Sequence, residues 1–94
     1  MLTPERSMKV QAELGSDIAL VFDECTPFNV TREYTAKSTE RTHRWLQRCL
    51  DWHHENASPQ QLVYGIVQGG VYEDLRTESA AFVAASECPG IAIG

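Results

Sequence analysis

The sequence predicts an α/β fold in which helices and parallel strands alternate in the order α-β-α-β-α-β. Segments whose apolar residues recur at helical spacing alternate along the chain with short runs that are apolar throughout. Continuous apolar runs, without interleaved polar residues, are typical of parallel strands buried on both faces. Glycine and proline residues separate the segments. This alternation favours a parallel sheet with its helices packed outside it.

The first helix is predicted to begin at Pro4 and to end at Gly15. Thr3 is a suitable N-cap, and proline is tolerated at the first helical position because the N–H that it lacks would have no partner there. Gly15 is the residue best able to adopt the left-handed conformation that ends a helix. The apolar pairs at helical spacing are Met8 with Ala12 and Val10 with Leu14.

Three strands and two further helices are predicted after this helix. The strands cover residues 18–22, 62–67 and 91–93, and the helices run from about Thr35 to Glu55 and from about Val71 to Ala85. Residues 56–59, which include a proline, break the long helix. The apolar positions are Trp45, Leu46, Cys49, Leu50, Trp52 and His53 on the long helix, and Leu75, Phe82 and Val83 on the last.

An open sheet of three such strands would be incomplete. Successive crossovers of one hand place the helices on one side, which leaves one apolar face and two edges of the sheet uncovered. Curvature into a barrel, together with further strands, would cover them. The 94 residues are far fewer than the roughly 250 of a closed (β/α)8 barrel. We therefore interpret residues 1–94 as a single segment, one sector of a larger structure.

Charge and composition exclude several classes of function. The 8 basic and 13 acidic residues give a formal net charge of -5, which argues against a nucleic-acid-binding surface on this segment alone. No run approaches the roughly 18 apolar residues of a membrane span, and the first residues lack the apolar core of a signal peptide. We expect a cytoplasmic protein that does not contact a membrane. Cys25, Cys49 and Cys88 are odd in number and unevenly spaced, so we expect reduced thiols and no metal ion in this segment.

Two of the predicted strands end in polar side chains. Asp23 follows the first strand, and Gln68 follows the second. The loops at strand ends carry the chemistry of parallel α/β folds. Taken singly, each residue is explained more often by a hydrogen bond to its own loop. Taken together, the two residues lie at the same end of strands one crossover apart, so we expect them to be close.

Asp23 and Gln68 are also complementary to one edge of a guanine-type base. A carboxylate only accepts hydrogen bonds, so it suits the adjacent N1–H and exocyclic amine of guanine. A carboxamide can donate to the carbonyl oxygen beside them. A base flipped out of a nucleic acid is read through this Watson–Crick edge. The two residues are therefore candidates for base recognition.

The chain also contains an ordered set of motifs: residues 2–7 (LTPERS), 14–18 (LGSDI), 22–27 (FDECTP), 65–70 (GIVQGG) and 92–94 (AIG). Together they resemble the central part of the tRNA-guanine transglycosylases, the queuine tRNA-ribosyltransferase family. The resemblance implies that the larger structure is a (β/α)8 TIM barrel, which exchanges a guanine in tRNA for a 7-deazaguanine base through a covalent enzyme–ribose intermediate. It implies that Asp23 and Gln68 recognise the base and that Cys25 lines the pocket.

The same resemblance implies that other parts of the activity lie outside these residues. The family's nucleophile is an aspartate in a later barrel segment, and an aspartate near the start of the barrel assists it. Three cysteines and a histidine near the C-terminus hold a structural zinc in the full-length parent. We expect none of these groups within the 94 residues, so the isolated segment should catalyse no exchange and should self-associate. The base and tRNA are the expected partners of the parent.

Two further interpretations concern the whole chain and its long helix. The chain could be a small free-standing α/β module that binds a nucleotide or a protein partner at the same strand ends; such a module would be a monomer. Cys49 and His53 lie one helical turn apart and could form half of a metal site, but core packing is the more common explanation. His43 and His54 are expected to be solvated.

The glycine pair 69–70 precedes the last helix and could cradle a phosphate at the positive end of that helix. Glu73 and Asp74 would repel an anion there, so we favour a tight turn.

Overall fold

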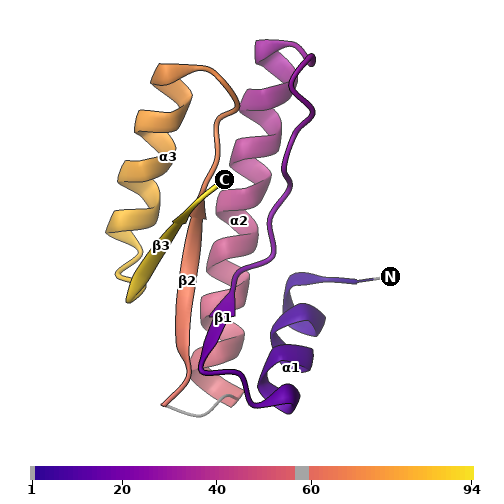
Figure 1. Ribbon diagram of the computed structural model, residues 1–94, viewed down its shortest axis with the longest axis vertical. Coiled ribbons are helices and arrows are strands. Elements are labelled where there is room, and N and C mark those ends of the chain that lie inside the picture. The colour runs from indigo at the N-terminus through magenta and orange to yellow at the C-terminus, as the bar shows by residue number, and fades with distance from the viewer. Residues whose placement is uncertain (1, 57–59) are drawn as a thin grey trace.

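The computed structural model describes residues 2–56 and 60–94, in which helices and strands alternate along the chain. The elements are α1 (Pro4–Leu14), β1 (Ile18–Leu20), α2 (Arg32–Asn56), β2 (Leu62–Val67), α3 (Glu73–Ala85) and β3 (Gly90–Ile93). The strands form one parallel sheet in the order β1-β2-β3, so the predicted α/β class with parallel strands is confirmed. Helices α2 and α3 lie behind the sheet, and α1 lies beside α2 (Figure 1).

The apolar core lies between the sheet and the helices. It contains Met8, Ala19, Val21, Leu46, Cys49, Val63, Val67 and Val83. Val83 of α3 and Leu46 of α2 both pack against β2 at Gly65. A Cβ atom at Gly65 would lie 2.7 Å from Val83 Cγ1 and 3.0 Å from Cys88 Sγ, so a larger residue does not fit without displacing them.

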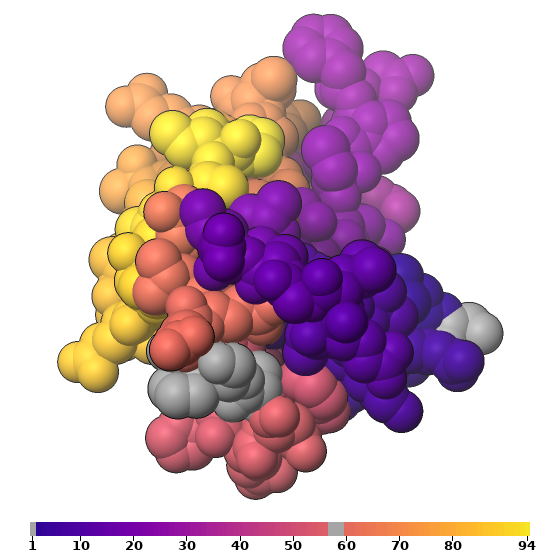
Figure 2. Space-filling model, turned by 60° about the horizontal axis from the view of Figure 1, so that its bottom comes forward, coloured from indigo at the N-terminus to yellow at the C-terminus, as the bar shows by residue number. Residues whose placement is uncertain are grey.

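The opposite face of the sheet is uncovered. Ile18, Leu20 and Leu62 are each close to half exposed, and the space-filling view shows β1, β2 and β3 side by side at the surface (Figure 2). The continuous apolar runs predicted strands buried on both faces, and this prediction is wrong for the sheet of this chain. The reason is the one-sided arrangement of the helices, which leaves one face of the sheet open.

Three predicted apolar positions are also exposed. Val10 is 44%, Leu14 78% and Phe82 41% exposed. Only Met8 of the first helix's apolar pairs is fully buried, because α1 packs on α2 over a narrow strip. Helical spacing marks which residues share a face, and the width of the buried strip depends on the neighbouring elements.

Two helices begin at different residues from those predicted. Helix α2 begins at Arg32 rather than near Thr35, because the Thr31 hydroxyl accepts a hydrogen bond from the Tyr34 N–H and caps the first turn. Helix α3 begins at Glu73, two residues late, after a turn closed by the Tyr72 N–H on the Gly69 carbonyl. Helix α2 ends at Asn56, and the remainder of the predicted helix break, residues 57–59, lies outside the described residues.

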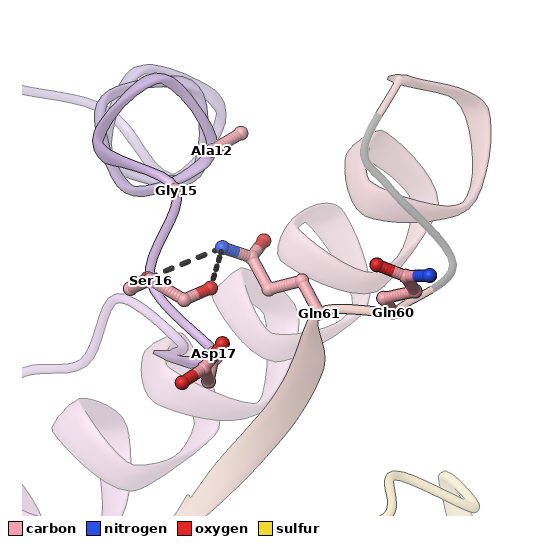
Figure 3. Close-up of a pocket in the computed structure, with 6 residues that line it drawn as sticks. All are labelled: Ala12, Gly15, Ser16, Asp17, Gln60 and Gln61. Atoms are coloured by element: carbon pink, nitrogen blue, oxygen red, sulfur yellow. Dashed lines mark hydrogen bonds between the residues drawn. The ribbon is translucent and has the colours of Figure 1, made fainter.

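The amino ends of β1 and β2 are joined by one glutamine side chain. The carboxamide of Gln61 donates to the Ser16 carbonyl at 2.8 Å and lies 3.1 Å from its hydroxyl. This contact closes one side of a shallow pocket whose other lining residues include Gly15 and Asp17 (Figure 3). The pocket lies at the end of the sheet opposite to Asp23 and Gln68, and its contacts hold the turn after α1 against the start of β2.

Within the described ranges, none of the helices has both the length and the hydropathy that crossing a membrane requires.

Candidate functional site

Asp23 and Gln68 meet at the carboxyl end of the sheet. Asp23 comes three residues after β1, and Gln68 directly follows β2. The Gln68 side chain donates from Nε2 to Asp23 Oδ2 at 2.5 Å. Gln68 is only 5% exposed, whereas Asp23 is half-buried. The structure therefore brings the two predicted residues into direct contact.

The loop that carries Asp23 is fastened along α2. It runs beside the amino-terminal half of that helix (Figure 1). The Glu24 N–H donates to Thr42 Oγ1 at 3.0 Å, and the Ser38 hydroxyl donates to the Glu24 carboxylate at 2.5 Å. Arg41 lies 3.4 Å from the other oxygen of that carboxylate. These contacts fix the backbone next to Asp23, so its carboxylate is presented from an ordered loop.

Gln68 is held by its backbone as well as by its side chain. Its N–H donates to the hydroxyl of Ser79 on α3 at 3.0 Å, and that hydroxyl lies 2.9 Å from His43 Nε2. Gly94 packs against the carboxamide, since a Cβ there would lie 2.5 Å from Gln68 Nε2. The backbone N–H of Gln68 is therefore held by α3, and its side-chain carboxamide is confined by Gly94 at the end of β3.

The expectation that His43 is solvated is wrong. The side chain is 9% exposed, and its ring stacks on Phe82 with the centroids 4.2 Å apart. Burial lowers the pKa of His43, against an opposing influence of the Glu78 and Glu40 charges. Helix α2 places this histidine against α3, where Ser79 supplies a polar partner, and the local sequence gives no sign of that partner. His54 is exposed, as expected.

The glycine pair after Gln68 forms a tight turn. Gly69 has φ of 135° and Gly70 has φ of 59°, conformations that favour glycine. Arg76 donates to the Gly70 carbonyl at 3.1 Å and to the Gly94 carbonyl at 3.0 Å. Asp74, in the first turn of α3, pairs with Arg32. These contacts support the turn interpretation, because the side chains at this helix end fasten the loop and the end of β3.

Cys25 is exposed in the loop after β1, two residues beyond Asp23. It lies on the same loop as the carboxylate, and its role as a pocket residue stays a prediction.

The model of the queuine tRNA-ribosyltransferase family matches residues 1–94, the whole of this chain. The chain belongs to the queuine tRNA-ribosyltransferase family. It is similar to curated queuine tRNA-ribosyltransferases of Bacillus subtilis (strain 168) and Staphylococcus aureus (strain JH9), each 50% identical over 93 residues. The protein of that name from Bacillus cereus (strain B4264) is 52% identical over 94 residues. Each match covers 99% of this chain and 24% of the relative, so the chain spans about a quarter of the length of these proteins.

The structural zinc that the family resemblance implies finds no suitable residues here. The described part of the chain contains no group of three or more His, Cys, Asp or Glu side chains able to hold a metal ion. Cys25 is exposed, Cys49 is buried in the core and Cys88 is half-buried. Burial raises the pKa of Cys49 to about 11, which disfavours the thiolate that a metal would need. Cys49 therefore packs in the core, as expected, and His53 is partly buried one turn after it.

Sequence reasoning missed the hydroxyl groups that hold the site of this queuine tRNA-ribosyltransferase segment. Thr35, Ser38, Thr39 and Thr42 form a buried stripe on the first half of α2, and Ser38 and Thr42 of this stripe bond to the loop that carries Asp23. Their spacing is that of one helical face, so the stripe was visible as a pattern of small polar residues where apolar ones are usual. Ser79 had no comparable signal, since its partners come from β2 and α2.

Proposed function

We propose that this chain is the base-recognising part of a queuine tRNA-ribosyltransferase that exchanges guanine in tRNA for a 7-deazaguanine base. Asp23 and Gln68 read the base in this proposal. The observation that carries it is the 2.5 Å contact between Gln68 Nε2 and Asp23 Oδ2 at the ends of neighbouring strands. Family membership supports the proposed reaction, and the contact supports the place proposed for the base.

The paired side chains present hydrogen-bonding groups in an order that suits guanine. The Asp23 carboxylate accepts at both oxygens, which matches the N1–H and the exocyclic amine of the base. The Gln68 amide has two N–H groups, so one can stay on Asp23 while the other donates to the guanine carbonyl oxygen. A 7-deazaguanine base keeps the same three groups on this edge. Cys25, on the same loop as Asp23, would line the pocket beside the base.

The open face of the sheet supports a barrel in the full-length protein. Ile18, Leu20 and Leu62 lie on one apolar face that the helices of this chain do not cover. Further strands that curve the sheet into a (β/α)8 barrel would enclose this face, with Asp23 and Gln68 at the carboxyl ends of the barrel strands, where such enzymes bind substrates. The isolated chain is expected to self-associate through the same face.

The remaining parts of the proposal concern the parent protein. Its nucleophilic aspartate, the assisting aspartate and the structural zinc would lie outside the 94 residues described by this sequence. The tRNA contacts would also come mainly from elsewhere, because this segment carries a net charge of -5. We propose the cytoplasm as the compartment of the parent enzyme, which is consistent with a tRNA substrate.

The test uses the full-length protein that contains this chain, with guanine exchange into tRNA as the assay. Asp23→Ala and Gln68→Ala should each raise the KM for guanine by about tenfold or more, because each removes a hydrogen bond that involves a charged or buried group. Asp17→Asn is the matched control, since Asp17 is an exposed carboxylate at the opposite end of β1. If the KM of Asp23→Ala for guanine equals that of Asp17→Asn, the role assigned to Asp23 is refuted.

A further inference from the structure

The backbone N–H of Gln68 is satisfied by a side chain. Gln68 lies just beyond the last residue of β2, and its N–H donates to Ser79 Oγ at 3.0 Å. Ser79 is fully buried and Gln68 is 5% exposed, so water does not compete for this bond. A buried N–H that loses its partner carries the full cost of desolvation. The backbone N–H of Gln68 therefore depends on one hydroxyl group of α3 for its hydrogen bond.

That hydroxyl has a second partner of its own. His43 Nε2 lies 2.9 Å from Ser79 Oγ, and the His43 ring is fixed by its stack on Phe82. Burial lowers the pKa of His43 and so favours the neutral ring, which can accept a hydrogen bond at Nε2. In the neutral tautomer that carries its proton on Nδ1, the Ser79 hydroxyl donates to His43 Nε2 while its oxygen accepts from the Gln68 N–H. The two bonds polarise each other in the same direction.

Helix α2 holds both base-reading residues through two consecutive side chains. Thr42 accepts the Glu24 N–H next to Asp23, and His43 contacts the serine that accepts the Gln68 N–H. The two anchored loops meet in the hydrogen bond between Gln68 and Asp23. A shift of Ser79 would move the Gln68 backbone and would misplace a carboxamide that must meet a base within a fraction of an ångström.

We propose that Ser79, oriented by His43, is a positioning residue that fixes Gln68 for recognition of the base. The proposal rests on the function proposed above. Ser79 touches no substrate in this proposal and acts only through Gln68. Its removal should therefore weaken binding of the base and leave binding of the tRNA unchanged.

The experiment is a double-mutant cycle in the full-length protein that contains this chain, with guanine as the probe. Ser79→Ala should raise the KM for guanine by about tenfold and leave the KM for tRNA unchanged. In a Gln68→Ala background the same substitution should change the guanine KM by no more than about twofold. Gln68→Ala keeps the backbone N–H, so the structural cost of Ser79→Ala is the same in both backgrounds and only the positioning effect disappears. Ser86→Ala is the control, because the Ser86 hydroxyl donates to the Val83 carbonyl at the other end of α3 and should leave both KM values unchanged.

The outcomes separate this proposal from the one on which it rests. A guanine KM that rises equally in both backgrounds, or that does not change in Ser79→Ala, would overturn the positioning role while Gln68→Ala still shows that the amide reads the base. A Gln68→Ala protein with a normal guanine KM would refute the proposed function itself. If Ser79→Ala does not fold, His43→Phe replaces it, since phenylalanine keeps a ring on Phe82 and removes only the partner of Ser79. A rise of about threefold that vanishes with Gln68→Ala supports the proposal, and an unchanged guanine KM overturns it.

Discussion

Thr42→Val tests how the loop that carries Asp23 is held in place. Thr42 is 1% exposed, and its hydroxyl accepts the Glu24 N–H at 3.0 Å. Valine has nearly the same shape, so packing is kept while the N–H loses its acceptor. An orphaned N–H costs about 1–3 kcal/mol when buried, and because Glu24 is only half-buried we expect about 1–2 kcal/mol here. Local opening of the loop should then become about 5- to 30-fold more frequent.

Hydrogen exchange measured by mass spectrometry on the peptide covering residues 21–27 reports this opening in the full-length protein. Thr39→Val is the matched control, because Thr39 lies on the same helix, is 5% exposed, and donates only to the Thr35 carbonyl one turn before it. That substitution should leave exchange in the loop unchanged. Equal exchange in Thr42→Val, Thr39→Val and the parent would refute the reasoning that the Thr42 hydroxyl fastens the loop.

Three other predictions follow from the core and its titratable groups. Gly65→Ala should destabilise the fold by about 1–3 kcal/mol in denaturant unfolding, since the new Cβ would lie 2.7 Å from Val83 Cγ1; unchanged stability would contradict that contact. Burial raises the pKa of Cys49 to about 11, so iodoacetamide at pH 8 should alkylate the exposed Cys25 and leave Cys49 unmodified until the protein unfolds; equal rates would contradict it. The pKa of His43 is lowered in the folded state, so its contribution to stability is complete above a pH of about 6.5 and is lost as the pH falls through the folded value. The Tm of His43→Phe should therefore fall less between pH 7 and pH 5 than the Tm of the parent. Identical slopes of Tm against pH in the two proteins would argue against a buried neutral histidine.

The fold could be predicted from local patterns because each element carries its own signal. Thr3 and Gly15 cap α1 as expected, and the Thr3 hydroxyl accepts the Arg6 N–H at 3.1 Å. The apolar runs 18–22 and 62–67 indicated the parallel strands, although β1 ends at Leu20. Exposure was harder to predict. Leu14 and Phe82 have the spacing of buried residues, yet Leu14 is 78% exposed, and Phe82 is 41% exposed although its ring stacks on His43.

Of the site, the sequence predicted the two side chains at the strand ends and not the groups that hold them in place. Asp23 and Gln68 stand out because a polar side chain directly after a buried strand needs a partner. The groups that hold them come from other elements: Thr42 and His43 from α2, and Ser79 from α3. A serine or histidine within a helix has many possible partners, and sequence spacing does not say which loop will lie across it. His43 was misjudged for this reason.

The measurement that bears most directly on the central claim compares guanine with hypoxanthine, which lacks the exocyclic amine. If the Asp23 carboxylate accepts a hydrogen bond from that amine, the full-length protein that contains this chain should bind guanine more tightly by about 10- to 150-fold, the range for a hydrogen bond to a charged group. Asp23→Ala should bind both bases weakly and with nearly equal Kd values. A guanine preference that survives Asp23→Ala at its original size would show that another residue reads the amine.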